Sequence, residues 1–318
     1  MELARITAQQ VLILFVMILT GAVCFRSGLI KEDGKRVLSD ILLYLIAPDI
    51  LLYLIAPAML IDSYMVEFDP ATFHNLLMTF VLSGVLLLLG LAVSFIFTWK
   101  LKSPNIVILR FACTFSNAGY MGFPLIRALF GEEGILYASA FLTMFNLLLW
   151  TQGYVMTSGK ARPREIAVSI ASCPSIIAVV SGLLIYLLRI PVSEIIKSPI
   201  SMIGDMNTPV SMIVIGLTIA GSDIRRLLKS RELGVVILLR LFVTPLIGAL
   251  LFFVLGVHGM VPMIALILEA CPCAAITTMF AIKFNHSQDL AAGSVVITTL
   301  LSIVTLPLYS LILSAMVG

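Results

Sequence analysis

The chain has 318 residues, of which 60% are hydrophobic and 12% are charged, and its mean hydropathy is +1.12. Soluble domains are about half apolar and about a quarter charged, so this composition excludes a soluble protein and indicates an integral membrane protein. The net charge of +3 comes from short clusters of Lys and Arg between apolar segments, a pattern that argues against a nucleic-acid partner.

Hydropathy predicts an all-α membrane protein with ten transmembrane helices. A span needs about 20 apolar residues, so the chain has room for about ten spans and no soluble domain. A polar break, TSGKARPRE at 157–165, separates five spans from five more. The predicted spans are 8–30, 37–61, 72–98, 106–130, 134–156, 166–189, 199–221, 233–256, 260–283 and 288–316.

The Lys and Arg residues between spans gather on alternate connections. These connections hold Arg26, Lys31, Lys35 and Arg36, then Lys100 and Lys102, then Lys160, Arg162 and Arg164, then Arg225, Arg226, Lys229 and Arg231, and finally Lys283. By the positive-inside rule, these connections face the cytoplasm. Both termini of this multi-pass protein of the cytoplasmic (inner) membrane then lie on the outer side. Because each half has an odd number of spans, the second half enters from the opposite face. We therefore predict two inverted five-helix repeats, 1–156 and 166–318, joined by a cytoplasmic linker at 157–165.

Short matches between the halves support the inverted repeat. Pro57 in the second span pairs with Pro209 in the seventh, and Pro124 in the fourth pairs with Pro272 in the ninth. The fifth and tenth spans align without gaps when the pairs are Ser139 with Ser294, Thr143 with Thr298 and Tyr154 with Tyr309. The common order of these matches is more persuasive than any one of them.

The nonapeptide DILLYLIAP occurs twice in tandem, at 40–48 and 49–57. Nine residues rotate an α-helix by about 900° and advance it by about 13.5 Å, so the two copies must face opposite ways. We expect one copy to be an insertion that lengthens or distorts the second span. Asp40, Asp49 and Asp205 are more readily explained as capping or snorkelling residues near helix ends than as functional ones.

Helix breakers fall at matching places in the two halves. Gly119, Gly122 and Pro124 lie in the fourth span, and Pro272 lies in the ninth. One such cluster alone fits a simple kink equally well, but backbone freed at membrane depth in both halves must line protein or a water-filled cavity. Two half-helix N-termini that converge there would suit a carboxylate, so the pattern favours a small organic anion as ligand.

The motif FSNAGYMGFPL at 115–125 resembles the Asn-x-Gly-x-x-x-x-Pro-Leu crossover of the auxin efflux carrier family, which includes bacterial permeases and plant PIN exporters. The stretch EACPCAAITTMFAIKFNHSQDLAAGSVVITTLLSIVTLP at 269–307 is similar to the second crossover and last helix of that family. With ILLYLIAP in the second span, the resemblance covers the whole chain. It departs from the family in the ninth span, where Cys271 and Cys273 flank the proline.

The resemblance implies a carrier in which broken helices 4 and 9 cross. Helices 1, 2, 6 and 7 would form a scaffold and a homodimer, and helices 3, 4, 5, 8, 9 and 10 a moving transport domain. Asn117 would be the main substrate ligand, with Pro124 and Pro272 holding the crossing. We expect the same site to be lined by Ser116, Gly119, Asn146 and Ala274, although an amide at Asn146 fits a bond between helices equally well.

Glu269 is the main candidate for coupling, because a carboxylate deep in an apolar segment is costly unless it is neutral, paired or functional. It could bind a proton, or share a sodium ion with Ser116, Asn117 and Thr143. The bile acid sodium symporters look similar here, with a Ser-Asn pair in the fourth span and a Glu near the ninth-span break. The alternative is an ion pair of Glu269 with Arg110 or Arg240.

Other chemistry has weaker signals. Cys271 and Cys273 could bind a soft ion such as Cu(I), but small residues that pack beside a helix break explain them better, and we expect free thiols and no metal or cofactor. The chain has no Gly-x-Ser-x-Gly or His-Glu-x-x-His motif, so we expect no enzyme activity.

The sequence thus predicts a secondary transporter that exports small organic anions, such as auxin-like aromatic acids or malate-type carboxylates, by elevator-like alternating access. A proton, a sodium ion or the membrane potential alone could drive it. Two alternatives remain open: a sodium-coupled organic-anion symporter, and a non-transporting membrane sensor that binds its ligand in the same pocket.

Overall fold

The computed structural model describes residues 2–31, 34, 55–160, 163–221 and 230–317. Within these ranges the chain is helical almost throughout and contains no β-strand beyond one isolated bridge. Most of the duplicated nonapeptide at 40–57, including Asp40 and Asp49, lies outside the described residues. The prediction that one copy is an insertion therefore stays a prediction.

The helical segments follow one another with short connections. In the first half they are α1 (Glu2–Arg26), α3 (Ile55–Ser63), α4 (Pro70–Thr98), α5 (Ile106–Thr114), η1 (Ala118–Gly122), α6 (Phe123–Leu148), η2 (Leu149–Gly153) and α7 (Tyr154–Ser158). In the second half they are α8 (Pro163–Ala171), α9 (Pro174–Leu187), α10 (Glu194–Asp205), α11 (Asn207–Ala220), α13 (Arg231–Leu238), η3 (Leu239–Val243), α14 (Thr244–Val254), α15 (Met260–Ala270), α16 (Ile276–Lys283) and α17 (Gln288–Val317).

Helix α6 contains the boundary between the predicted fourth and fifth spans. Gly131 has φ 65° and ψ −155°, which is outside the helical region, so two helices meet there. Glycine allows this positive φ without the steric penalty of a Cβ atom. The predicted boundary between 130 and 134 therefore coincides with a break in helical geometry at Gly131, and the separation of a fourth from a fifth span stays a prediction.

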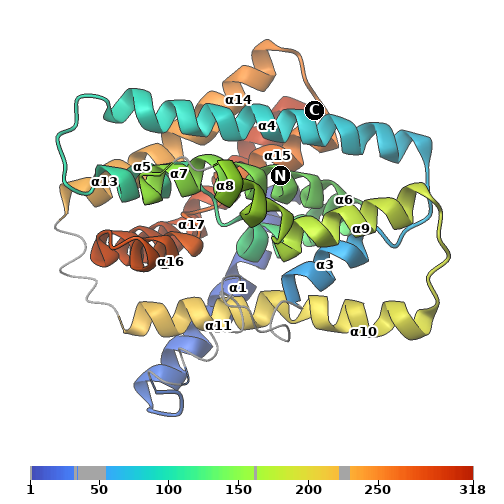
Figure 1. Ribbon diagram of the computed structural model, residues 1–318, viewed down its shortest axis with the longest axis horizontal. Coiled ribbons are helices and arrows are strands. Elements are labelled where there is room, and N and C mark those ends of the chain that lie inside the picture. Colours follow the sequence, from blue (N-terminus) through green and yellow to red (C-terminus); the bar gives the residue numbers. More distant parts are fainter. Residues whose placement is uncertain (1, 32–33, 35–54, 161–162, 222–229, 318) are drawn as a thin grey trace.

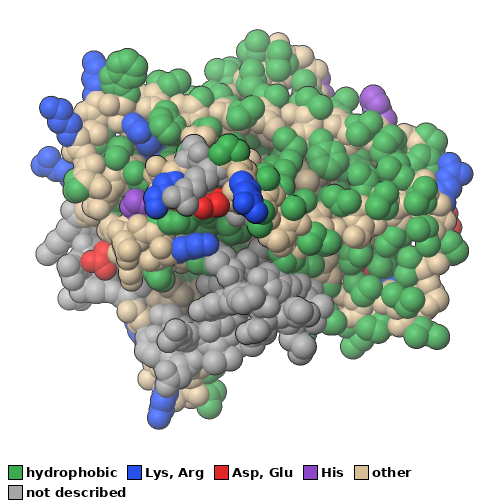
Figure 2. Space-filling model, viewed as in Figure 1, with side chains coloured by type: hydrophobic (Ala, Val, Ile, Leu, Met, Phe, Trp, Pro, Cys, Tyr) green, Lys and Arg blue, Asp and Glu red, His purple; other side chains and the backbone are tan. Residues whose placement is uncertain are grey.

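The exposed side chains of α1 indicate which solvent surrounds this helix. Its exposed side chains Leu12, Val16, Leu19 and Val23 recur at helical spacing, and all four are more than half exposed. A helix that is apolar on its exposed face as well as its buried one fits lipid rather than water. Figure 2 shows the same property over much of the visible face, with Lys and Arg gathered mainly toward the end where α4 ends and α13 begins.

Six helical stretches among the described residues are long and apolar enough to cross a membrane. They are Glu2–Arg26, Pro70–Thr98, Ala118–Ser158, Glu194–Ala220, Arg231–Val254 and Gln288–Leu313, and the shorter apolar helices are Pro174–Leu187 and Met260–Ala270. The chain is thus an all-helical integral membrane protein. The count of ten spans stays a prediction.

Helices pack most closely where a glycine on one helix faces the backbone of another. Helix α1 lies along α11, where a Cβ atom on Gly216 would stand 1.9 Å from the carbonyl oxygen of Ile18. Helix α3 packs on α9 and α10, and a Cβ atom on Gly204 would stand 2.9 Å from the Cα of Met59. Small residues let membrane helices approach this closely and gain van der Waals contact.

A second group of helices packs around the two broken segments. Helix α4 contacts α5, α6 and α15, while α17 contacts α13 and α16. In Figure 1, α4 runs above α5, α7 and α15, while α10 and α11 run below them. Ser116, Asn117, Pro272 and Cys273 are buried, so the breaks lie inside the protein.

Candidate functional site

Two helices are interrupted at the centre of the site, and their non-helical segments lie side by side. The chain is not helical between α5 and η1, or at 271–275 between α15 and α16. These segments pair antiparallel at Ser116 and Cys273. The backbone N–H of Asn117 donates to the carbonyl of Pro272 at 2.7 Å, and that of Ala274 donates to the carbonyl of Phe115 at 2.9 Å. Each break thus satisfies backbone groups that the other leaves unpaired.

The first break begins before the glycines and proline that were expected to cause it. The backbone leaves the helix at Phe115, with ψ 118°, and Asn117 has ψ 43°. Pro124 lies in the first turn of α6 and follows the wide π-turn η1. Proline lacks an N–H and clashes with the carbonyl four residues earlier, so a five-residue turn accommodates it without ending the helix.

Gly122 also has a packing role in place of a breaking one. A Cβ atom there would stand 2.5 Å from Cδ2 of Leu268 and 3.3 Å from Sγ of Cys271. The missing side chain lets η1 approach the end of α15, which brings the two breaks together.

The second break contains its proline. Pro272 follows Cys271, whose ψ is 152°, and the helix resumes at Ile276. The backbone N–H of Cys273 donates to Oγ1 of Thr298 on α17 at 3.0 Å. Side chains of the last helix therefore stabilise this irregular backbone.

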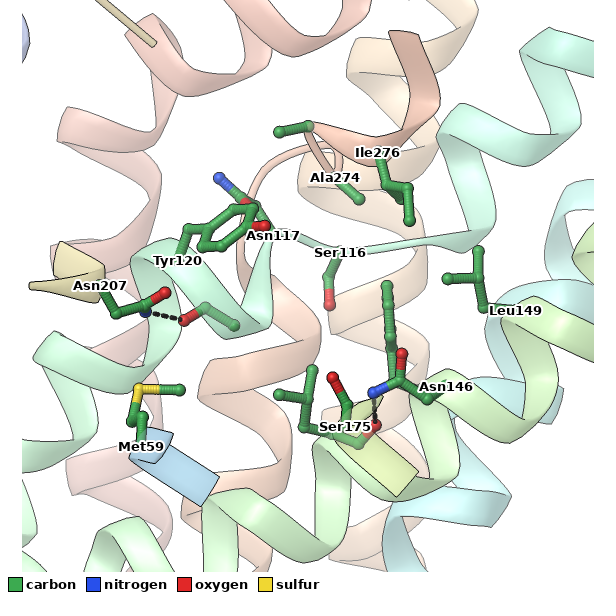
Figure 3. Close-up of a pocket in the computed structure, with 14 residues that line it drawn as sticks. Met59, Ser116, Asn117, Tyr120, Asn146, Leu149, Ser175, Asn207, Ala274 and Ile276 are labelled. Atoms are coloured by element: carbon green, nitrogen blue, oxygen red, sulfur yellow. Dashed lines mark hydrogen bonds between the residues drawn. The ribbon is translucent and has the colours of Figure 1, made fainter. Parts of the chain in front are cut away.

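A cavity of about 70 Å³ lies against the pair of breaks. All five residues that were predicted to line the substrate site lie on it: Ser116, Asn117, Gly119, Asn146 and Ala274. The first turns of η1 and α16 face the same space through Tyr120 and Ile276. Figure 3 shows the two breaks on one side of the cavity, with Met59, Ser175 and Asn146 across from them.

Several buried polar atoms at this cavity have no hydrogen-bond partner among the described residues. They are Oγ of Ser116, Nδ2 of Asn117 and Oδ1 of Asn207. The other end of the Asn207 amide is occupied, because its Nδ2 donates to the carbonyl of Gly119 at 3.0 Å. Unpaired buried groups cost free energy, and other such atoms lie away from the cavity, among them Oε2 of Glu269. The three atoms at the cavity are available to a polar ligand or to water.

Two predicted residues have local partners. Nδ2 of Asn146 donates to the carbonyl of Leu142 at 2.9 Å, one turn back on α6. This hydrogen bond lies within one helix and does not join two helices. Oγ1 of Thr143 donates to the carbonyl of Ser139 at 2.8 Å, and Thr143 is not among the residues that line the cavity.

Glu269 forms the ion pair that was the alternative to a coupling role. Its Oε1 lies 2.9 Å from a terminal nitrogen of Arg240, and both side chains are fully buried. Arg110 is not the partner, because its Nε donates to Oγ1 of Thr98. Glu269 does not line the cavity.

A model of the family described as "Membrane transport protein" matches residues 6–310. The chain belongs to the auxin efflux carrier family. An uncharacterised transporter of Methanothermobacter thermautotrophicus is 24% identical over 311 residues, which cover 96% of this chain and 98% of the relative. An uncharacterised transporter of Methanocaldococcus jannaschii is 26% identical over 320 residues, which cover 95% of this chain and 97% of that relative.

Sequence reasoning about this auxin efflux carrier family member did not foresee the positions of Asn207, Ser175 and Tyr120 on the cavity. A signal existed for Asn207, which precedes Pro209, the partner of Pro57 in the repeat. Ser175 carried none, and Tyr120 lies within the motif at 115–125 but was not predicted to line the site. Among the described residues, Asp205 pairs with Arg127 at 2.6 Å on a partly exposed surface, which agrees with a role near a helix end.

The cysteines that distinguish this family member at the second break are buried free thiols. Sγ of Cys273 lies 3.3 Å from Oγ1 of Thr277, and Sγ of Cys271 donates to the carbonyl of Ile267. No group of three or more potential metal ligands occurs in the part of the chain that the structure describes. Both thiols fill space beside the break.

Proposed function

We propose that this protein is a secondary transporter that exports small organic anions across the cytoplasmic membrane. One observation carries the proposal: the first turns of η1 and α16 open on one cavity, beside the unpaired polar atoms of Ser116 and Asn117. A helix N-terminus carries about half a positive charge and unpaired N–H groups. Two of them beside side-chain donors favour a carboxylate.

The rest of the lining suggests the class of anion. Apolar side chains of Met59, Leu142, Phe145, Leu149 and Ile276 surround the polar groups. Such a lining suits an apolar body with one carboxylate, so its chemistry favours auxin-like aromatic acids over malate-type dicarboxylates. At about 70 Å³ the cavity must widen to admit a ring system of that size.

The proposed architecture has ten spans in two inverted repeats, 1–156 and 166–318, with both termini outside. Its support is the sequence match, because the paired Thr residues bond one turn back as helical Thr residues elsewhere in the chain also do. Thr143 donates to the carbonyl of Ser139, and Thr298 donates to the carbonyl of Ser294. These are the pairs by which the fifth and tenth spans align.

An elevator-like motion would move one group of helices against the other. Helices α1, α3, α9, α10 and α11 pack together, as a scaffold and a dimer would require. The bond from Asn207 on α11 to the carbonyl of Gly119 on η1 joins the two groups at the substrate cavity. Such a motion must break this bond.

Three cavities lie one after another along α11 and suggest a route for the substrate. A cavity of about 450 Å³ is lined by Asp205 and Thr208 and shares Met59 with the central cavity. A third, of about 40 Å³, is lined by Ser211 and Thr218 and shares Tyr120 with the central cavity. Met59 and Tyr120 therefore lie between neighbouring cavities.

Thiol labelling tests this route and the orientation. Thr208→Cys should react with a membrane-impermeant maleimide added outside intact cells. Thr218→Cys should react only with reagent supplied from the cytoplasmic side, because the basic loop that follows α11 places the C-terminal end of that helix inside. The unmodified chain is the control, since four native cysteines are buried and Cys24 is half-buried. Reversed sidedness would overturn the orientation, and no reaction at either position would overturn the route.

Counterflow in proteoliposomes tests the function. Vesicles loaded with indole-3-acetate should accumulate labelled indole-3-acetate, those loaded with malate should accumulate less, and those loaded with indole-3-acetamide should accumulate none. An exported monoanion gains about 2.3 kcal/mol per 100 mV from an inside-negative potential, so efflux should proceed without sodium. Saturable binding without counterflow would favour the sensor, and an absolute sodium requirement would favour the symporter.

A further inference from the structure

The Arg240 guanidinium lies directly behind the two breaks. It is fully buried on η3, and its NH1 donates to the carbonyls of Thr114 at 3.0 Å and Cys113 at 3.2 Å. Its Nε donates to the carbonyl of Cys271 at 3.2 Å, and its NH2 to Glu269 at 2.9 Å. One side chain thus holds the C-terminal ends of both α5 and α15.

These acceptors explain why a charge is buried here. The last carbonyls of a helix have no partner within it and carry about half a negative charge. Two such ends meet at the crossing, inside a protein that lipid surrounds, where water cannot pair them. A planar guanidinium with five N–H donors can bind several carbonyls and a carboxylate at once.

The crossing therefore has two electrically different sides. The C-terminal ends face Arg240, and the N-terminal ends of η1 and α16 face the cavity. With its negative ends bound by the guanidinium, whose charge Glu269 in turn balances, the crossing presents mainly its positive ends to the cavity. Glu269 accepts from the guanidinium through Oε1 and does not line the cavity, while its Oε2 has no hydrogen-bond partner among the described residues.

We infer that Arg240 is a positioning residue that makes the cavity selective for anions, and that Glu269 holds Arg240 and does not bind a coupling cation. This inference rests on the proposed function. It assigns anion preference to a charge outside the substrate site. It also separates this protein from a carrier in which the same carboxylate binds sodium.

The opposite signs of the two side chains give opposite expected results. Glu269→Gln keeps an oxygen acceptor for Arg240 but removes a negative charge, so indole-3-acetate should bind as tightly as in the wild type or tighter, by up to about tenfold. Arg240→Gln leaves Glu269 unpaired behind the crossing and should weaken binding by about a hundredfold or more. Indole-3-acetamide, which is neutral, should show neither shift.

The double variant Arg240→Gln/Glu269→Gln keeps the inference testable if the Arg240 single variant does not fold. It restores neutrality, so it should fold better than Arg240→Gln, and it should bind indole-3-acetate more weakly than Glu269→Gln does. Binding per folded molecule is measured by scintillation proximity on monodisperse protein, with and without sodium.

Three results would overturn the inference. Unchanged affinity per folded molecule in Glu269→Gln and the double variant would show that the pair only stabilises the fold. Weaker binding in Glu269→Gln, with loss of a sodium effect present in the wild type, would make Glu269 a coupling residue. A wild-type protein that binds neither indole-3-acetate nor malate would contradict the proposed function, and the inference would fall with it.

Discussion

Asn117→Asp should weaken the binding of carboxylates by about a hundredfold while the protein stays folded. The side chain lines the cavity, and its Nδ2 has no partner among the described residues. A negative charge about 5 Å from the ligand's carboxylate costs about 3 kcal/mol at an effective dielectric of about 20, which is a loss of about a hundredfold. Isothermal titration with indole-3-acetate on purified protein measures it.

Asn117→Ala separates recognition from folding. Loss of one hydrogen bond to a charged group should weaken binding by about 1 to 3 kcal/mol. The pairing of the breaks should survive, because it uses the backbone N–H of Asn117 and not its side chain. Asn75→Asp repeats the Asn117→Asp change on α4, outside the cavity lining. It should leave the affinity for indole-3-acetate unchanged. A lower melting temperature with unchanged affinity would mean that the Asn117 side chain serves the fold alone.

Gly216→Ala should strongly destabilise the protein. The added Cβ atom would stand 1.9 Å from the carbonyl oxygen of Ile18 and 2.9 Å from the backbone nitrogen of Ala22, so α1 and α11 must separate. Backbone cannot yield as a flexible side chain does, and we expect a loss of about 3 kcal/mol or more. The measurement is the melting temperature in detergent, followed by fluorescence-detected size exclusion.

Gly234→Ala is the matched control for this change. Gly234 also lies in a helix, α13, but a Cβ atom there meets nothing within 4 Å. Alanine should therefore raise helix stability by up to about 1 kcal/mol. Equal melting temperatures for the two variants would show that α1 and α11 are not packed as closely as the glycines indicate.

Composition and hydropathy were sufficient to predict an all-helical membrane protein, because lipid leaves few ways to satisfy a backbone. The motif at 115–125 and the matching break were sufficient to predict part of the cavity lining, namely Ser116, Asn117, Gly119 and Ala274, but not Tyr120, Ser175 or Asn207. Their role in binding stays a prediction.

The start of the first break could not be predicted from residue types. Pro124 is tolerated because the preceding turn widens, and the extended conformation of Phe115 depends on its pairing with Ala274 far along the chain. The partners of Arg240 were equally hidden, because a long side chain can reach many positions. Only the tertiary structure selects among Arg110, Arg240 and the helix ends.

The pairing of the two breaks has a consequence for biosynthesis. Asn117 leaves the ribosome about half a chain before Pro272, its hydrogen-bond acceptor, so at roughly 5–20 residues per second it waits on the order of ten seconds for that partner. Throughout this interval the first break cannot lie exposed in the hydrocarbon, where each unpaired backbone group costs several kcal/mol. The insertion machinery, or delayed entry of this segment into the bilayer, must shelter it until the second break arrives. A newly made first half lacks the partners of the Asn117 N–H and the Phe115 carbonyl, so we expect that it does not fold as an independent domain.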